Sequence, residues 1–199
     1  MKRLLLLLFV CALSCPVWGQ SNVWDDRTTT YKNDRIGVEW QIPFELTWQH
    51  RPVSGPDCYL KIRNDEIGVV LALTAKQILL NYDDIWKYSD MYKDEDVKEM
   101  VQLSAKNLGF EYNSSFAKTI TIDNKHAIQT VTDFVQYWPD YDISTHYITC
   151  IYEVFYVGYH YTFEILGMTV PDNEIEDFME ISNAIISGVR ILYREDPLP

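Results

Sequence analysis

Residues 67–75 form a nearly continuous apolar run, which constrains the fold more than any other segment of this chain. Only Gly68 and Thr74 interrupt the order Ile-Gly-Val-Val-Leu-Ala-Leu-Thr-Ala, and the polar turn 64–66 precedes it. A short apolar run of this kind is typical of a β-strand that is buried on both faces. The fold must therefore cover each side of a sheet.

Other segments alternate between apolar and polar residues, with the period of two that indicates half-buried strands. Pro43 ends the first of them, because proline cannot donate a hydrogen bond to the ladder. The turn Asp123-Asn124 and the later Gly158 each separate two such segments, which predicts antiparallel hairpins. The expected strands are residues 36–42, 58–63, 116–122, 127–137, 147–155 and 159–166.

Two longer segments have the apolar spacing of helices. One begins at Asp94, a good N-cap, and ends at Gly109, while the other follows residues 171–173 near the end of the chain. Asp83 could cap a shorter helix before the first of them. These elements predict an α+β fold, a mostly antiparallel sheet of six to seven strands with helices on both faces, as in a three-layer α/β/α sandwich.

The N-terminus is typical of a signal peptide. Lys2 and Arg3 precede the apolar run 4–13, which is about half the length of the roughly 20 residues that a membrane span needs. Small residues favour cleavage after Gly19. The alternative is cleavage before Cys15, which would carry a lipid and anchor the protein to a membrane.

The rest of the chain shows no repeat and no apolar stretch long enough to span a bilayer. We therefore divide it into a signal peptide over 1–19, a polar arm over 20–34, a single domain over 35–193 and a tail over 194–199. The expected location is periplasmic or extracellular, or at the membrane surface if Cys15 is lipidated.

The net charge limits which classes of partner the protein can bind, and the cysteine content limits which disulfides it can form. The full chain has 29 acidic and 17 basic residues, and losing Lys2 and Arg3 with the leader takes the net charge from −12 to −14. Such acidity repels phosphate, which argues against nucleic acid and against an anionic membrane surface as partners.

Removal of the signal peptide also leaves Cys58 and Cys150 as the two cysteines of the exported chain. An oxidising compartment would allow one disulfide between them.

Three segments resemble the PsbP-like superfamily, which includes a photosystem extrinsic subunit, a Ran-binding import factor and exported bacterial proteins. They are the strand Gly37–Pro43 followed by Trp48, the hairpin Ile120–Ala127, and the closing helix Phe178–Val189. The resemblance covers most of residues 31–192 and implies two helical layers around an antiparallel sheet. The resemblance also implies a binding or assembly role, and it assigns no catalytic residues to this chain.

The residues themselves favour no catalytic chemistry. The four histidines lack metal-binding spacing, the acidic segment 83–96 lacks an EF-hand pattern, and neither a nucleophile elbow nor a phosphate-binding loop is present. We expect no metal, no cofactor and no catalytic residue. A small secreted hydrolase with a dispersed site of acids and histidines remains the alternative in the class of enzymes.

Aromatic residues are the most suggestive feature for function. They crowd residues 137–161, where β-propensity explains most of them. Tyr137, Trp138 and Tyr141 surround a Pro-Asp turn instead, so we expect these three to form a contact surface. The sequence thus predicts a non-catalytic binding or assembly factor for a protein or envelope component, of open oligomeric state. A carbohydrate- or ligand-binding module using the same aromatics is a further alternative.

Overall fold

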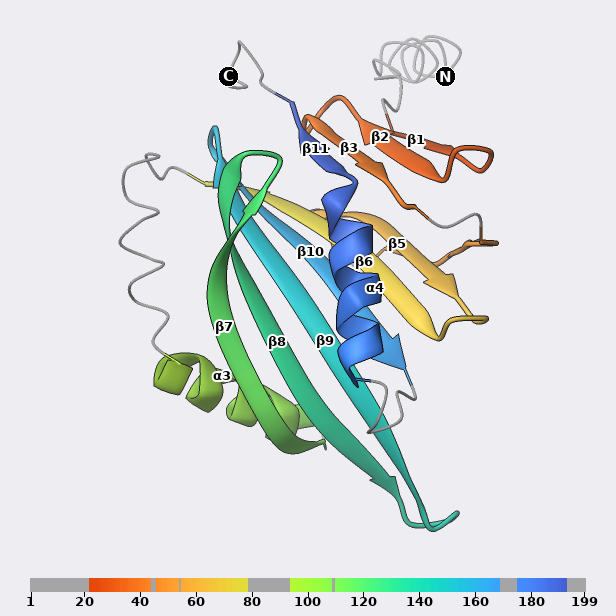
Figure 1. Ribbon diagram of the computed structural model, residues 1–199, viewed down its shortest axis with the longest axis vertical. Coiled ribbons are helices and arrows are strands. Elements are labelled where there is room, and N and C mark those ends of the chain that lie inside the picture. The colour runs from red at the N-terminus through yellow and green to blue at the C-terminus, as the bar shows by residue number, and fades with distance from the viewer. Residues whose placement is uncertain are drawn as a thin grey trace, which may run out of the picture.

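A computed structural model describes residues 22–43, 46–53, 55–78, 94–108, 110–168 and 175–192. The predicted signal peptide, Cys15, the helix capped by Asp83 and the tail 194–199 lie outside these residues. Within them, most residues belong to antiparallel strands and two helices are present, which confirms the α+β class (Figure 1).

The larger sheet has seven strands in the order β4-β5-β6-β10-β9-β8-β7. Every neighbouring pair in it is antiparallel. Its strands are β4 (Gln49–His50), β5 (Cys58–Asn64), β6 (Val69–Gln77), β7 (Glu111–Ile122), β8 (Lys125–Trp138), β9 (Ile143–Tyr156) and β10 (Tyr159–Met168).

Strand β6 lies inside this sheet, as the apolar run predicts, but it is fully buried on one face only. Val69, Leu71 and Leu73 have no exposed surface, whereas the residues between them are half-buried. On that second face Ala72 lies opposite Glu164 of β10, so a polar side chain occupies space that the prediction gave to apolar cover. The prediction of complete burial on both faces is therefore wrong for the second face.

A second sheet of four strands has the order β1-β2-β3-β11. Its strands are β1 (Asn22–Asp25), β2 (Thr30–Asn33), β3 (Val38–Gln41) and β11 (Val189–Ile191). The expectation of a polar arm over residues 20–34 is therefore wrong for β1 and β2. The reason is that Trp24 and Tyr31 pack against the core, while the polar residues that dominate this segment face outward.

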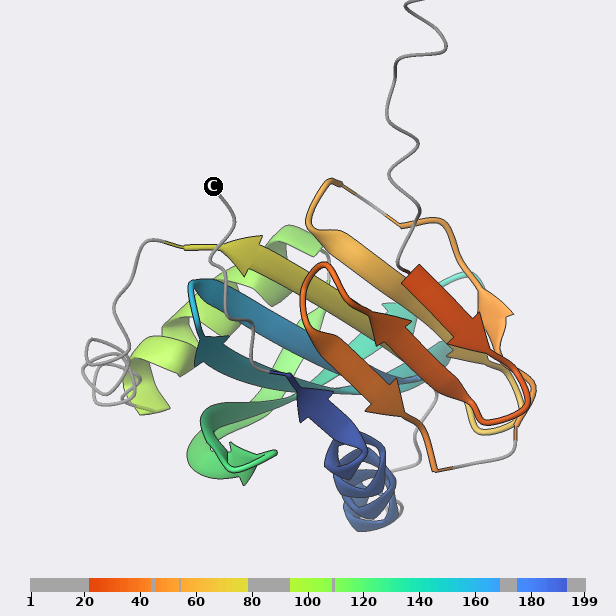
Figure 2. The same cartoon turned by 90° about the horizontal axis from the view of Figure 1, so that it is seen from above.

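The helices are α3 (Asp94–Leu108), which lies against β7, and α4 (Ile175–Ser187), which lies across β9 and β10. Figure 2 shows α4 beside the small sheet, close to β11. Phe178, Ile185 and Ile186 form the buried side of α4, as the helical spacing predicts. None of the helices in the described residues is long and apolar enough to cross a membrane.

Turn chemistry explains how the long hairpins form. Asp123 and Asn124 both have positive φ, of 47° and 59°, between β7 and β8. Two left-handed residues give the turn whose twist matches that of paired strands, and Asp and Asn tolerate this conformation. The hairpin predicted at this turn is therefore confirmed, and so is the hairpin around Gly158 between β9 and β10.

Candidate functional site

The tip of the β8–β9 hairpin is the first candidate site. The two strands pair out to Trp138 and Ile143, and the turn 139–142 closes them. The backbone N–H of Tyr141 donates to the carbonyl of Trp138 at 3.1 Å, which holds the turn in place. Figure 1 shows this hairpin extending beyond the other strands of the sheet, so its tip has few neighbours.

The tip exposes large apolar side chains together. The exposed fractions are 55% for Tyr137, 41% for Trp138, 74% for Tyr141 and 55% for Ile143. Asp140 and Asp142 in the turn are also exposed. The Tyr137 hydroxyl donates to Asp142 Oδ1 at 2.9 Å, and this hydrogen bond raises the pKa of the phenol. The structure thus brings Tyr137, Trp138 and Tyr141 to one exposed, acidic end of the molecule.

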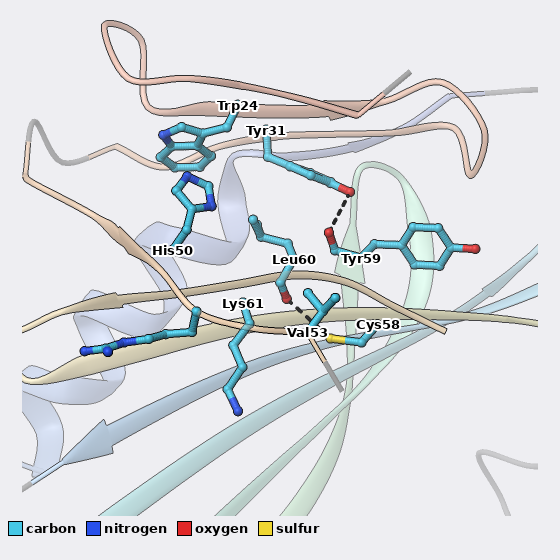
Figure 3. Close-up of a pocket in the computed structure, with 9 residues that line it drawn as sticks. Trp24, Tyr31, His50, Val53, Cys58, Tyr59, Leu60 and Lys61 are labelled. Atoms are coloured by element: carbon cyan, nitrogen blue, oxygen red, sulfur yellow. Dashed lines mark hydrogen bonds between the residues drawn. The ribbon is translucent and has the colours of Figure 1, made fainter. Parts of the chain in front are cut away.

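A second candidate site is a hollow between the small sheet and strands β4 and β5, shown in Figure 3. Its volume is about 340 Å³, and its lining includes Trp24, Tyr31, His50 and Leu60. The Trp24 and His50 rings meet edge to face, 5.5 Å apart. The Tyr31 hydroxyl donates to the Tyr59 carbonyl oxygen at 3.3 Å. These contacts connect β1 and β2 to β4 and β5.

Sequence reasoning missed this hollow because it treated β1 and β2 as an arm. The signal was present in the segment, since Val23 and Trp24 interrupt a polar run and Tyr31 stands between Thr30 and Lys32. Large apolar residues that stand within an otherwise polar segment are typical of short strands that cover a core.

Two histidine–carboxylate pairs are the nearest approach to catalytic chemistry. His146 Nε2 lies 2.5 Å from Asp133 Oδ1 on one face of the sheet, and His160 Nε2 lies 2.9 Å from Glu153 Oε1 on the other. Asn113 Nδ2 also donates to Asp133 Oδ2 at 2.6 Å. Among the residues that the structure describes, no three His, Cys, Asp or Glu side chains are grouped so as to hold a metal ion.

Cys58 and Cys150 are free thiols in this structure, so the disulfide that an oxidising compartment would allow between them is not formed here. In the register of the sheet, Cys150 of β9 lies level with Ile62 of β5. Strands β10 and β6 lie between these two strands, so β5 is three strand spacings away from β9. Three strand spacings are about 14 Å, twice the Cα separation of about 7 Å that a disulfide tolerates. Cys150 lies instead under α4, 3.4 Å from the Met179 sulfur, and burial raises the pKa of its thiol to about 11.

Comparison with known proteins establishes the fold. No family model matches the sequence, and no curated protein matches it. The structure is similar to cyanobacterial PsbP (CyanoP) from Synechocystis sp. PCC 6803, with 13% identity, a TM-score of 0.54, and coverage of 89% of this chain and 97% of that chain. It is also similar to LpqN, involved in cell envelope biogenesis of Mycobacterium tuberculosis, with 14% identity, a TM-score of 0.43, and coverage of 78% and 83%.

The chain therefore has a PsbP-like fold, which confirms the fold that its opening strand, central hairpin and closing helix suggest. A fold does not assign a function, so the function must be argued from the sites.

Proposed function

We propose that the protein is an exported, non-catalytic binding or assembly factor that contacts a protein or envelope component through the β8–β9 tip. The observation that carries this proposal is the group of exposed aromatic side chains on a hairpin that extends away from the body of the fold. Exposed aromatic residues that cluster in this way mark interaction sites, because they supply large contact areas with little conformational freedom to lose.

Charge suggests the chemistry of the partner. Asp140 and Asp142 flank Tyr141, and the whole chain carries a net charge of −12. A partner that fits this tip would present an apolar socket surrounded by Lys or Arg, since opposite charges steer association and exclude wrong partners. A protein surface fits this description better than an anionic lipid surface does.

Site-specific photo-crosslinking in the native envelope tests the proposal. A photoreactive residue in place of Tyr141 should give a discrete adduct that is lost when Trp138→Ala is added. The matched control is the same photoreactive residue in place of Leu103, which is 61% exposed on α3. The same adducts at both positions, or none at Tyr141, would contradict the role of the tip.

A stability measurement separates a contact surface from a structural role. The double variant Trp138→Ala and Tyr141→Ala should melt at about the temperature of the parent, because exposed substitutions usually change stability by less than about 0.5 kcal/mol. A large fall in melting temperature would place these side chains in the structural framework instead.

We also propose that helices cover both faces of the large sheet, giving three layers. Cys150 contacts Met179 of α4, whereas Phe110, just after α3, packs against Phe134 and Tyr147. Cys150 and Tyr147 are an odd number of residues apart on β9, so their side chains leave opposite faces. An experimental structure in which the second face of the sheet is open would contradict this arrangement.

Export itself is tested by the mass of the processed protein. The proposal predicts an N-terminus at Gln20 after cleavage behind Gly19. A mass that corresponds to a lipidated Cys15, abolished by Cys15→Ser, would instead establish the membrane-anchored alternative.

A further inference from the structure

Strand β7 leaves one edge of the large sheet open. It is the last strand in the order of that sheet, and among the strands that the structure describes it pairs only with β8 (Figure 1). Within the described residues, the backbone N–H and C=O groups on its outer side therefore have no ladder partner. Such an edge is a template for another β-strand, because each of these groups is a ready donor or acceptor.

Strand β7 is much longer than the other edge strands of the two sheets. The edge strands β4, β11 and β1 have two, three and four residues, whereas β7 has 12. Proteins usually protect a long edge with proline, with charged side chains or with a bulge. β7 contains no proline, and its bulge at Asn113 lies near its start, which leaves residues 114–122 as a regular edge.

The charge of β7 favours a second copy of this chain as its partner. The protein has a net charge of −12, so two copies repel one another on average. β7 has one acidic residue, Glu111, and one basic residue, Lys118, which makes the strand neutral. Lys118 is the only charged residue along the regular edge 114–122. Two copies can therefore approach along this edge with little of the repulsion that their net charge causes.

Symmetry restricts the register of such a pair. Opposed residues share a face of the sheet, so in a two-fold antiparallel pair even-numbered residues lie opposite even-numbered ones. Centring the pair on Phe116 brings the two Phe116 rings together and places Lys118 opposite Ser114 of the second copy. Centring it on Lys118 opposes two like charges, which is destabilising, and centring it on Ala117 loses the aromatic pair.

Phe116 is suited to the centre of this interface. Its side chain is 45% exposed, although it lies in the middle of a strand. It is level with Val131 of β8 and Cys150 of β9, so it lies on the face of the sheet that α4 covers two strands away. An aromatic pair across two strands stabilises a sheet, and here it also removes exposed apolar surface from water.

We propose that β7 pairs antiparallel with β7 of a second copy, with Phe116 on the two-fold axis, so that the two large sheets become one. The bulge at Asn113 ends the ladder, which limits the paired segment to residues 114–118 of each chain. Glu111 lies opposite Val135, near the base of the β8–β9 tip, so the antiparallel strands place the two tips at opposite ends of the dimer. The pairing does not depend on the function proposed for the tip.

Disulfide trapping tests the pairing and its register. The exported form with Cys58→Ser lacks the half-exposed native thiol. In this form Phe116→Cys should oxidise to a covalent dimer, because opposed residues have Cα atoms about 4.5–5.5 Å apart. The matched control is Thr121→Cys, whose two copies lie about 34 Å apart in this register, at about 3.4 Å per residue. No covalent dimer from Phe116→Cys, or an equal yield from Thr121→Cys, would overturn the proposal.

Sedimentation equilibrium tests the charges across the pair. The parent should show a reversible equilibrium between monomer and dimer. Ser114→Lys should raise the Kd of the dimer by about two- to thirtyfold, because it opposes two pairs of lysines. Adding Lys118→Glu should restore association, since each pair then joins opposite charges. Thr121→Lys is the matched control, because it changes the net charge equally outside the paired segment and should not weaken association.

Thermal unfolding of the variants separates loss of association from loss of the fold. The side chains at 114, 116, 118 and 121 are all exposed, so each variant should melt close to the parent. A parent that is monomeric at every concentration would overturn the pairing. Equal association of the Ser114→Lys and Thr121→Lys variants would overturn the register.

Discussion

Trp40 of β3 connects three elements of the fold through one side chain. It has no exposed surface, its Nε1–H donates to the carbonyl of Ile185 in α4 at 3.0 Å, and its ring meets Phe163 of β10 edge to face at 5.2 Å. The small sheet is therefore held to the helix and to the large sheet at the same residue.

Replacing Trp40 with Phe tests the hydrogen bond. The variant keeps an aromatic ring near Phe163 but leaves the Ile185 carbonyl without this donor, so the free energy of unfolding should fall by about 1–3 kcal/mol. Denaturant unfolding measures the change, and the exposed Trp138→Phe should show almost none. Equal stability of the two variants would mean that the Trp40 hydrogen bond contributes nothing.

Glu164 makes stability depend on pH. Burial raises its pKa above the usual value of 4.5, and the nearby Lys61 lowers it by less. The folded state therefore holds this proton more tightly than the unfolded state does. Its contribution to stability is complete below about pH 4.5 and is lost as the pH rises through the raised pKa.

Glu164→Gln removes this titration. The free energy of unfolding of the parent, minus that of the variant, should decrease as the pH rises from about 4 to neutral, because only the parent acquires a buried charge. Urea unfolding at a series of pH values measures this difference. A difference that stays constant or increases with pH would show that Lys61 compensates fully for burial.

The junction between α4 and β11 depends on Gly188. Its carbonyl accepts a hydrogen bond from the Gln41 N–H at 3.0 Å, and a Cβ atom at Gly188 would overlap the Gln41 carbonyl group. A rigid backbone group stands in the way, so the strand pairing must shift if a side chain is added.

Gly188→Ala should therefore destabilise the protein by about 1–3 kcal/mol, as overpacked sites do. Gly55→Ala is the matched control, because nothing lies within 4 Å of its Cβ position and only its positive φ of 89° opposes alanine, at a cost of about 1 kcal/mol. Thermal or urea unfolding compares the two variants. A smaller effect at Gly188 than at Gly55 would contradict the close contact.

At the scale of the whole molecule, the strand order keeps the two thiols apart. The exported form, without Cys11 and Cys15, should contain two reactive thiols per chain after denaturation, because Cys58 and Cys150 lie three strands apart. Thiol titration of protein purified without reductant measures this number. A value near zero, with an unchanged monomer mass, would indicate a disulfide and a different strand order.

Local patterns predicted most elements of the large sheet. The segments expected over 58–63, 127–137, 147–155 and 159–166 all lie within strands, and the helix expected from Asp94 spans Asp94–Leu108. These predictions succeed because side-chain periodicity and turn residues act within a few positions along the chain. The exposure of the aromatic residues at 137–141 was also visible in the sequence, since a Pro-Asp turn between aromatic residues is a local feature.

The sequence alone thus determined most strands of the large sheet, the helices α3 and α4 and the hairpins at Asp123-Asn124 and Gly158, because each depends on neighbouring residues. Only the tertiary structure decided that residues 22–33 join a second sheet, that Cys58 and Cys150 lie apart, and that Trp24 comes to stand beside His50. These results depend on contacts between distant segments, such as β3 with β11, whose partners no local pattern specifies.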